Sequence, residues 1–404
     1  MRGGILYISY DGMLEPLGQS QVLAYLEELA PNWRVHLVSF EKPADWADRA
    51  RRRTVAERIA AAGIRWHPLT YHKRPTAPAT AFDIAHGTAR ALALALRHRL
   101  AIVHARSYVA ALIALAVKRV TGAKFLFDMR GLWADERVDG GLWPRGGRLY
   151  RIAKSIERRL LLAADHVVTL THASEAEIHG FPYLAERAPP MSVIPTCADL
   201  DRFTIQGPPP TAPFVLGYVG SVGTWYLLDD MLRCFRFIQA AEPGARLLVV
   251  NRNEQALIAE RVRHHGIDPA AVDVRASEHR DLPRLIARMS AGMALIKPVY
   301  SKIASAPTKL AEYLGCGVPC LGTTGVGDME SILESRRVGV ALRDSSDDEL
   351  QCGIERLVAL TRDPDVQDRC RRAATELFSL DTGVAAYAAI YDRLAATPAR
   401  ANEK

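Results

Sequence analysis

The sequence of 404 residues lacks any apolar run long enough to cross a lipid bilayer. Its longest uninterrupted run, Val109 to Val117, is well short of the roughly 20 residues that a spanning helix needs. The N-terminal stretch, MRGGILYISYDG, enters a strand-like pattern at once, without the longer apolar region and small-residue cleavage site of a signal peptide. These absences predict a cytoplasmic protein without a transmembrane helix.

Paired cysteines are also lacking. The six cysteines all occur from Cys197 onward, and no two form a Cys-x-x-Cys pair or stand near a histidine at the spacing of a zinc site. We therefore expect reduced cysteines and no metal ion.

The formal net charge of +7 favours an anionic partner. A nucleotide sugar, a membrane surface and a nucleic acid all meet that description. However, the sequence contains no stripe of lysines and arginines interleaved with aromatic residues, which is typical of nucleic-acid binding. We therefore expect no nucleic-acid partner.

Short apolar runs alternate with helical patterns along the whole chain, which predicts α/β domains with mostly parallel, doubly wound sheets. The expected strands of the first half are Ile5 to Ser9, Val35 to Phe40, Ile102 to His104, Lys124 to Asp128, His166 to Leu170 and Ser192 to Pro195. The pattern breaks at the proline-rich stretch GPPPTAP, residues 207–213, and restarts with a strand from Phe214 to Val219 and a helix from Trp225 to Ala240. The sequence thus predicts two domains joined by a linker.

Polar residues follow several strands of the first half. Asp11, Gly18 and Gln19 come after the first strand, His104 and Arg106 close a middle strand, and Asp128 and Arg130 close the next. Ligands of such sheets bind beyond the carboxyl ends of the strands, so these residues are candidates for a site. The alternatives are that His104 is an interior histidine and that Asp128 and Arg130 form a structural ion pair.

The stretch from Lys297 to Asp328 combines lysines with one carboxylate around a short helix. The helix is expected to start near Thr308, after Pro307, so that its free amides lie beside Lys309, an arrangement suited to a phosphate. Glu312 follows one turn later, where it could accept hydrogen bonds from a ribose or sugar diol. The alternative is that Lys309 and Glu312 form a solvated pair on an ordinary helix.

Glycines Gly217, Gly220 and Gly223 begin the second half, but their spacing is not that of a dinucleotide-binding turn. We expect Gly220 and Ser221 to allow close backbone approach to a phosphate. A different feature, Arg145 to Leu162, reads as a helix with one basic and one apolar face, which could lie against anionic lipid. The simpler interpretation is that its apolar stripe packs on the sheet and its arginines are solvated.

Four stretches resemble the retaining glycosyltransferases of family 4, which have the GT-B fold. They are ILYISYDGMLEPLGQSQVLAYLEELA, VIPTCADLDRF, LGYVGSVGTWYLLDDML and SAPTKLAEYLGCGVPCLGTTGVGD. The resemblance implies two Rossmann-like domains that face each other across a cleft, and a last helix that crosses back to the N-terminal domain. The implied boundaries are an acceptor-binding domain at 1–195, a crossover and linker at 196–213, a nucleotide-sugar-binding domain at 214–378, and the crossover helix with a frayed tail at 379–404.

The resemblance further implies transfer of a sugar from a nucleotide donor to an acceptor hydroxyl, with retained configuration and without an essential metal or a cofactor. Lys309, Thr308 and Lys302 would stabilise the charge on the leaving diphosphate, and Glu312 would bind the ribose. Arg252 is a further candidate for the phosphates. Asp128, His104 and Asp11 would orient donor and acceptor, and Gly18, Gln19, Arg106 and Arg130 would complete the acceptor side.

Several positions depart from the family pattern. Ala304 stands where a first glutamate is expected, and Ser221 with Thr224 to Tyr226 replaces the usual arginine and lysine. A non-catalytic subunit that binds a nucleotide sugar and a sugar-nucleotide epimerase therefore remain alternatives. If the enzyme inverts configuration, Asp128 or Asp11 is the natural general base. The basic helix favours a lipid-linked or growing polysaccharide acceptor at the inner face of the membrane, where the protein would be peripheral.

Overall fold

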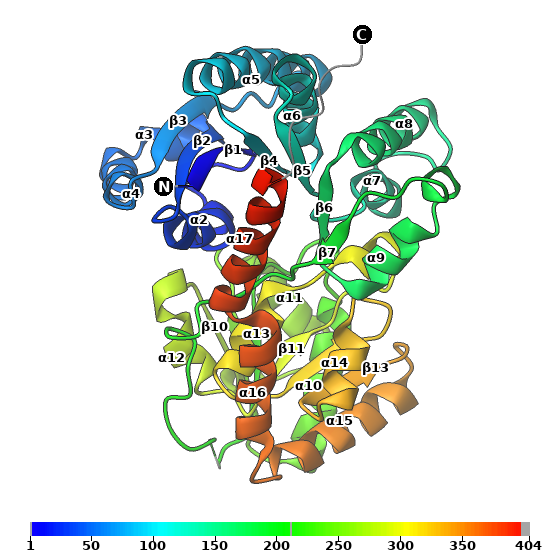
Figure 1. The fold of residues 1–404 in the computed structure, drawn as a ribbon. Coiled ribbons are helices and arrows are strands. Elements are labelled where there is room, and N and C mark those ends of the chain that lie inside the picture. Colours follow the sequence, from blue (N-terminus) through cyan, green and yellow to red (C-terminus); the bar gives the residue numbers. More distant parts are fainter. Residues whose placement is uncertain (1, 211, 397–404) are drawn as a thin grey trace. The chain divides into compact units, whose positions relative to one another are not determined.

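The computed structural model describes residues 2–210 and 212–396, which divide into two compact units. The first unit comprises residues 1–134, 143–194 and 380–404, and the second comprises residues 135–142 and 195–379. Each unit contains one fully parallel sheet, as the alternation of apolar runs and helices predicts (Figure 1).

The first unit has a seven-stranded sheet in the order β3-β2-β1-β4-β5-β6-β7. Its strands are β1 (Arg2–Ser9), β2 (Trp33–Glu41), β3 (Arg65–Thr70), β4 (Ile102–Arg106), β5 (Lys124–Asp128), β6 (His166–Thr169) and β7 (Met191–Val193). Its helices are α1 (Pro16–Gly18), a π-helical segment (Gln19–Leu23), α2 (Ala24–Leu29), α3 (Pro43–Ala47), α4 (Arg49–Ala61), α5 (Thr76–His98), α6 (Ser107–Thr121), α8 (Arg148–Ala163), α9 (His172–His179) and α17 (Leu380–Ala396). Helix α7 (Trp133–Asp139) begins in this unit and ends in the other.

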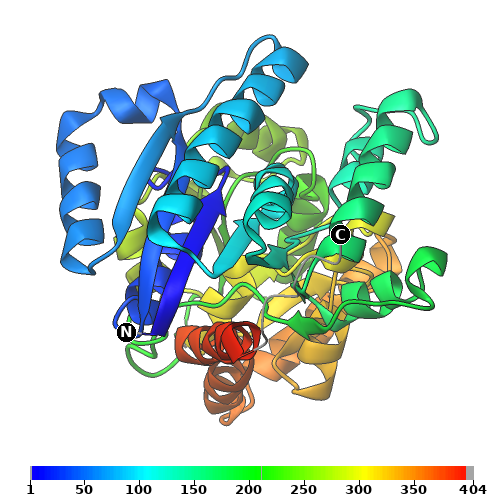
Figure 2. The same cartoon turned by 45° about the horizontal axis from the view of Figure 1, so that its top comes forward.

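Helices cover both faces of this sheet because its central strands are apolar on both sides. Gly87 of α5 lies against Phe40 of β2 and Ile113 of α6, and α5 and α6 pack side by side on that face (Figures 1 and 2). Tyr7 and His104 occupy paired positions on neighbouring strands, and the His104 ring contacts Tyr387 and Tyr391 of the last helix, α17, on the opposite face. The chain therefore returns to the first unit for its final helix, which confirms the expected crossover.

The second unit has a six-stranded sheet in the order β10-β9-β8-β11-β12-β13. Its strands are β8 (Val215–Val219), β9 (Arg246–Val250), β10 (Val272–Arg275), β11 (Ala291–Ala294), β12 (Cys320–Thr323) and β13 (Gly339–Leu342). Its helices are α10 (Leu228–Ala241), α11 (Gln255–His264), α12 (Leu282–Ile286), α13 (Thr308–Gly315), α14 (Met329–Ser335), α15 (Asp347–Thr361) and α16 (Val366–Phe378), with 3₁₀ turns at Pro269–Ala271, His279–Asp281 and Tyr300–Ala304. A further 3₁₀ turn, Pro182–Leu184, belongs to the first unit.

Two apolar cores lie on the two faces of the second sheet. One contains Phe235 of α10 with Leu216 of β8, and the other contains Tyr313 of α13 with Val219. The alternation of Leu216 and Val219 along β8 sends side chains into both cores, since neighbouring strand residues face opposite sides. The end of β8 is thus fixed from both faces.

Two expectations about the elements need correction, as do two about the domain boundaries. The strand β3 was not expected, because RWHPLT contains a proline and charged residues; such a strand is tolerated at the edge of a sheet, where β3 lies. The expected helix from Trp225 begins only at Leu228, so Trp225 and Tyr226 belong to a loop.

The boundaries also differ. Residues 135–142 belong to the second unit, and the crossover segment is not a free linker, because Ala198, Leu200 and Phe203 are buried in the core of the second unit. Thr211 in the proline-rich stretch and the expected tail at 397–404 lie outside the described residues.

Candidate functional site

The carboxyl ends of β8 and β11 mark the point in the second sheet where the strand order reverses. From β8 the chain moves outward to β9 and β10, and it then returns to place β11 on the other side of β8. Backbone hydrogen bonds join the segments that leave these strands, from the Leu227 amide to the Leu295 carbonyl at 3.2 Å and from the Lys297 amide to the Trp225 carbonyl at 2.9 Å. Sheets of this kind bind ligands at such a reversal of strand order. The glycine turn at 220–223 follows β8, and the segment 297–307 leads from β11 to the start of α13.

Lys309, in the first turn of α13, lies in a box of aromatic rings at this point. Its ammonium is 4.1 Å from the ring centre of Tyr218 and 4.0 Å from that of Tyr226, and it donates a hydrogen bond of 3.0 Å to the Tyr218 hydroxyl. The side chain is buried. Ring faces attract a cation and replace part of its lost hydration. The alternative of a solvated pair between Lys309 and Glu312 is therefore wrong.

The electrostatics of this box favour an anion. Burial lowers the pKa of Lys309 to about 7, although the nearby Cys320 and Glu312 oppose the shift. Within residues 2–210 and 212–396, Lys309 forms no ion pair. A buried ammonium without a carboxylate gains most from an anion that enters beside it, because the charge pair restores what burial removes. The free amides that begin α13 supply further donors at the same place.

The turn after β8 brings the backbone close to the Lys309 ammonium. Gly220 has φ of +128°, and a Cβ there would stand 3.1 Å from the Lys309 ammonium. Asn251, at the end of β9, donates from its side-chain amide to the Gly220 carbonyl at 2.9 Å, and the Tyr218 hydroxyl donates to the carbonyl of Ser221. Only glycine meets both the backbone conformation and the close approach. Gly220 and Ser221 thus line the turn beside Lys309, as expected.

Lys302 has a different environment from Lys309. Its ammonium lies 3.9 Å from the ring centre of Trp225 and forms an ion pair of 2.8 Å with Glu136. Glu136 belongs to residues 135–142, and Asp139 of the same segment accepts a hydrogen bond of 2.8 Å from the Ser301 amide. The cation that was expected to face a phosphate is therefore already paired with a carboxylate.

The remaining donor-site candidates occupy separate positions. Glu312 is buried and accepts a hydrogen bond of 3.0 Å from His279, whose ring contacts Phe203. Arg252 points to the segment after β10, where it pairs with Glu278 at 2.8 Å and donates to the Ser277 carbonyl. These contacts hold Glu312 through His279. They direct Arg252 away from Lys309 and its neighbours Tyr218 and Tyr226, which we call the lysine box.

Thr308 begins α13 and is partly exposed, with Pro307 as its N-cap and not as the expected first helical residue. The helix therefore has no side-chain cap at this end. Its first amides remain available to a ligand, in keeping with the predicted phosphate contact.

In the first unit, His104 and Asp128 are each only 1% exposed. His104 hydrogen-bonds the Tyr391 hydroxyl at 2.7 Å, and the Tyr387 hydroxyl donates to Asp128 at 3.2 Å. Both tyrosines come from α17, which therefore covers the two side chains. His104 and Asp128 project from neighbouring strands onto the same face of the sheet, and α17 occupies that face. Their position therefore does not support the prediction that they contact donor or acceptor.

Asp128 is the centre of a buried charge cluster. Arg106 and Arg130 approach it at 3.8 and 3.7 Å, and His104 lies at 3.7 Å. Burial by itself raises the pKa of Asp128, but Arg130, His104 and Arg106 together hold this pKa below its usual value. Burial lowers the pKa of His104, with Asp128 opposing. Asp128 and Arg130 therefore fit the alternative of a structural ion pair. Arg106 and His104 are further partners that the sequence did not indicate.

The loop after β1 is held tightly. Asp11 remains partly exposed and contacts Arg106 at 3.3 Å, and Gly18 is so close to the chain that a Cβ would stand 2.0 Å from the Gly12 carbonyl oxygen. The buried Glu41 accepts hydrogen bonds from the amides of Met13 and Leu14. Burial raises the pKa of this carboxyl group. Asp11 is thus the one predicted carboxylate of this unit that combines sheet-edge position with exposure.

Gln19, another predicted acceptor residue, is partly exposed and begins the π-helical segment. Such segments occur inside α-helices and often accompany functional sites. No feature of the sequence predicts this π-helical segment, because its residues also suit an ordinary α-helix.

Sequence reasoning did not identify several residues of the lysine box and its surroundings. Tyr218 reads as a core residue of a strand, and Tyr226 and Trp225 were placed in a helix. One signal was present: Trp225 and Tyr226 lie in the region where the resembling family has cations. Glu136 and His279 gave no signal, because both reach their lysine or glutamate partner from distant parts of the chain.

Among the described residues, no group of three histidine, cysteine, aspartate or glutamate side chains could hold a metal ion. Across 2–210 and 212–396, no helix combines the length and apolar character needed to cross a membrane.

Comparisons with known proteins agree with this architecture. Residues 18–197 match the family model of the glycosyl transferase 4-like domain. No curated protein matches the sequence. Sucrose-phosphate synthase from Thermosynechococcus elongatus superimposes with a TM-score of 0.72 at 15% identity, over 97% of this chain and 99% of that chain.

Two further solved structures are similar. A glycosyltransferase from Rickettsia africae has a TM-score of 0.71 at 12% identity, over 98% of this chain and 100% of that chain. Anabaena Alr3699/HepE in complex with UDP-glucose has a TM-score of 0.66 at 14% identity, over 97% and 100% of the two chains. The chain therefore has the GT-B fold, and its residues 18–197 are similar to the glycosyl transferase 4-like domain.

Proposed function

We propose that the protein is a glycosyltransferase that moves a sugar from a nucleoside-diphosphate donor to an acceptor hydroxyl, with retained configuration and without an essential metal. The family match at residues 18–197 supports transferase chemistry. The complex of Anabaena Alr3699/HepE with UDP-glucose supports a nucleotide sugar as the donor class. The second unit would bind the donor, and the first unit would bind the acceptor.

The observation that carries this proposal is the lysine box. Lys309 is a buried cation without an acidic partner among the described residues, and it lies beside a glycine turn and the free amides of α13. A leaving diphosphate gains negative charge as the glycosidic bond breaks, so fixed donors of this kind stabilise the transition state. In other enzymes, the loss of one such donor costs about 2.7–4 kcal/mol.

In the proposed reaction the acceptor oxygen bonds to the anomeric carbon on the side from which the diphosphate departs. The bond between that carbon and the phosphate oxygen breaks, and its electron pair stays on the phosphate. The departing phosphate oxygen takes the proton of the acceptor hydroxyl, so no protein base is required. This route is consistent with the burial of His104 and Asp128, which are not available as bases.

A donor screen tests the proposal. The purified protein is heated with UDP-, GDP-, ADP- and dTDP-sugars in the presence of EDTA, and slow hydrolysis of each donor is measured in parallel. A ligand at 100 times its dissociation constant adds about 2.7 kcal/mol of stability, which a thermal shift detects. We expect a selective, EDTA-resistant shift that disappears in Lys309→Ala. The absence of any shift contradicts the proposal.

Product analysis separates the two alternative functions. A non-catalytic binding subunit shows the thermal shift but releases no nucleotide, with or without an acceptor. A sugar-nucleotide epimerase returns a nucleotide sugar with one inverted hydroxyl and needs no acceptor. The anomeric configuration of a transferred sugar, read by NMR, decides between retention and inversion.

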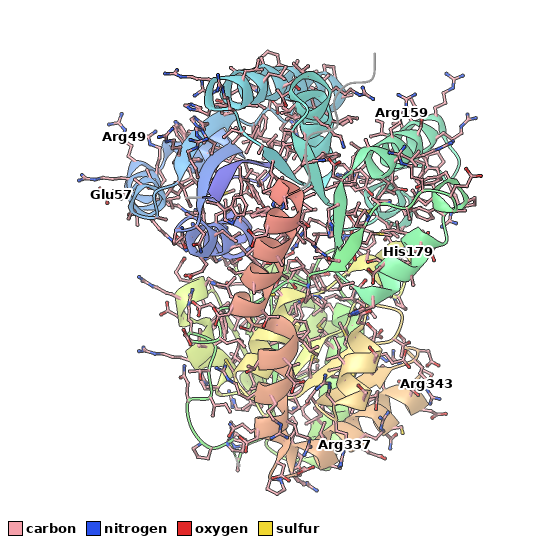
Figure 3. All side chains as sticks on the ribbon, viewed as in Figure 1. Arg49, Glu57, Arg159, His179, Arg337 and Arg343 are labelled. Carbon is pink, nitrogen blue, oxygen red and sulfur yellow. The ribbon has the colours of Figure 1, made fainter. Side chains whose placement is uncertain are left out.

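We further propose a lipid-linked or growing polysaccharide acceptor and peripheral contact with an anionic membrane through α8. Ala153, Leu160 and Leu161 of this helix are buried, whereas Leu149 and Ile152 are each 57% exposed. The helical spacing places these two with Ile156 on one arc, and exposed arginines flank the arc: Arg145, Arg148, Arg151 and Arg159. Arg159 projects outward from α8 (Figure 3).

The exposed arc fits a lipid surface because apolar side chains can enter the acyl boundary while arginines meet anionic headgroups. Vesicles with and without phosphatidylglycerol test the contact by co-sedimentation. We expect binding only to the anionic vesicles and its loss in Leu149→Ser/Ile152→Ser. Leu96→Ser, which changes an equally exposed leucine on α5, serves as the control. Equal binding by both variants removes α8 from the proposal.

A further inference from the structure

A second histidine and carboxylate pair lies in the first unit, separate from the buried cluster around Asp128. Asp83, on α5, is fully buried. One of its oxygens accepts hydrogen bonds from the Tyr10 hydroxyl at 2.8 Å and from the His72 amide at 3.0 Å. Its other oxygen lies 2.6 Å from Nδ1 of the His72 ring. Both carboxylate oxygens are therefore used to fix the segment that carries His72.

This contact determines which nitrogen of His72 is available. A carboxylate that accepts from its other neighbours also accepts from Nδ1, so Nδ1 of His72 carries a hydrogen, and in the neutral ring Nε2 is the hydrogen-bond acceptor. The His72 side chain is 42% exposed, in contrast to the buried His104. His72 thus presents an oriented hydrogen-bond acceptor to solvent. The same relation between a buried aspartate and an accessible histidine orients the histidine in enzymes that bind a substrate hydroxyl.

An exposed aromatic ring accompanies His72. Phe82, one turn into α5, is 55% exposed, and its ring meets the His72 ring edge to face at 5.2 Å. Tyr71, beside His72 in the chain, packs against Tyr10 at 5.3 Å. Tyr10 follows β1 and Tyr71 follows β3, so the group lies at the carboxyl edge of the sheet, where α/β sheets bind ligands.

We propose that His72 and Phe82 form a subsite for the carbohydrate acceptor. A sugar offers hydroxyls that donate to a fixed nitrogen, and a face of C–H groups that packs on the electron-rich face of an aromatic ring. An exposed ring beside an oriented histidine matches both properties. Asp83 acts as a positioning residue, because it touches His72 and not the ligand. This subsite rests on the proposed transferase function and specifies where its acceptor binds.

A titration with simple glycosides tests the subsite without knowledge of the natural acceptor. The probes are methyl β-D-glucopyranoside, methyl β-D-galactopyranoside, methyl α-D-mannopyranoside and methyl N-acetyl-β-D-glucosaminide. The NMR signal of the His72 ring is assigned by its loss in His72→Gln. We expect at least one glycoside to shift this signal and to leave the signal of His179 unchanged. His179 is an exposed histidine at the end of α9 and is labelled in Figure 3.

Two variants sharpen the test. Phe82→Ala should weaken glycoside binding at least fivefold, because the ring face is lost while its exposed position keeps the fold intact. Asp83→Asn should change the ¹⁵N shifts of the His72 ring, which report its tautomer, and weaken binding in parallel. A purely structural role for Asp83 predicts lower thermal stability without a change in tautomer. Unshifted His72 signals with all four glycosides, or equal shifts at His72 and His179, overturn the proposal.

The same samples distinguish this proposal from the proposed function. The UDP-, GDP-, ADP- and dTDP-sugars of the donor screen, UDP-glucose among them, are added to the samples in turn, and their binding is followed by thermal shift with Lys309→Ala as the reference. UDP-glucose binding without a glycoside response refutes the subsite and leaves the transferase proposal in place. A glycoside response without binding of any nucleotide sugar refutes the transferase proposal and leaves a carbohydrate site.

Discussion

Two buried charge clusters occupy corresponding places in the two units, each near the carboxyl ends of central strands, but they are built in opposite ways. In the first unit, Asp128 has Arg106, Arg130 and His104 around it, and tyrosines of α17 cover the group. In the second unit, the Lys309 ammonium lies against the rings of Tyr218 and Tyr226 and forms no ion pair within residues 2–210 and 212–396. The charge of Asp128 is paired with opposite charges inside the protein, whereas the charge of Lys309 is not.

The difference separates a structural cluster from a binding site. A buried charge that is paired within the protein needs nothing further, and its loss leaves the partners uncompensated. A buried charge without an opposite partner lowers stability until a ligand supplies one. The first arrangement therefore fastens α17 to its sheet, and the second prepares a place for an anion.

The largest expected effect concerns Asp128. Asp128→Asn keeps the size of the side chain but leaves Arg106 and Arg130 buried without the central negative charge, so we expect a loss of about 3–5 kcal/mol in the free energy of unfolding. Urea unfolding measures this change, and limited proteolysis should show earlier cleavage of α17. Glu28→Gln, at an exposed position of α2, is the control. An unchanged unfolding midpoint would show that the cluster does not hold the helix.

Removal of the charge of Lys309 should raise the free energy of unfolding, in contrast to the loss expected for Asp128→Asn. Burial lowers the pKa of Lys309 from its ordinary value of 10.5 to about 7 in the folded protein, so the charged form is disfavoured in the fold and stability decreases as the pH falls from 10.5 toward 7. Lys309→Met removes that cost at neutral pH, and we expect about 1–4 kcal/mol of added stability. Turnover should fall by about 10²–10³-fold.

Arg343→Ala is the matched control for Lys309→Met, because Arg343 is an exposed cation of the same unit and points away from the protein surface (Figure 3). It should leave turnover unchanged. A Lys309→Met protein that is less stable than the wild type, or that retains turnover, contradicts the assignment of Lys309 as an unpaired anion receptor.

A smaller effect is the pH dependence of donor binding. Above pH 7 the free protein loses the proton of Lys309, whereas a bound diphosphate favours the protonated form. The affinity for UDP-glucose should therefore decrease by up to about tenfold per pH unit above 7. Calorimetry between pH 6 and 8.5 measures this affinity and also the uptake of protons that should accompany binding. Lys309→Arg, which stays charged, should show a flat profile; a flat profile in the wild type rejects the mechanism.

The smallest expected effect concerns Lys302, whose situation lies between the two clusters because it has both an aromatic ring and a carboxylate. Glu136 competes with a donor phosphate for this ammonium, so Glu136→Gln should raise the affinity for UDP-glucose by about two- to fivefold, in the range of a partly exposed ion pair. Titration calorimetry checks it against Glu330→Gln, an exposed control on α14. A decrease in affinity would instead make Glu136 a positioning residue for Lys302.

The sequence was a good guide to the elements whose residues are apolar in a regular pattern. The strands β1, β4 and β5 and the helix α17 were all expected, because burial on both faces of a parallel sheet requires continuous apolar runs. The edge strand β3 was not, since its proline and charged residues follow no such pattern. The start of α10 was also misplaced, because Trp225 and Tyr226 suit a helix as well as a loop.

For the candidate site, the sequence indicated Lys309, Gly220 and Ser221 but not their surroundings. Spacing along α13 suggested a lysine next to a glutamate, yet Lys309 reaches Tyr218 on β8 and Glu312 reaches His279. His72 was not singled out, because its partner Asp83 gains meaning only when α5 packs on the sheet. Likewise, Asp128, which the sequence indicated as a site candidate, is covered by tyrosines from the far end of the chain.

By itself, the sequence determined the α/β class, the two-unit organisation and the parallel sheets, because these follow from local apolar periodicity and from glycine and proline positions. The return of the last helix was implied by the family resemblance. Only the tertiary structure decided which charges are paired and which are not. Pairing depends on residues that are brought together from distant segments, as Asp128 is with Tyr387 and Lys302 is with Glu136. The energy of a buried charge is set by its neighbours in space, and sequence distance carries little information about them.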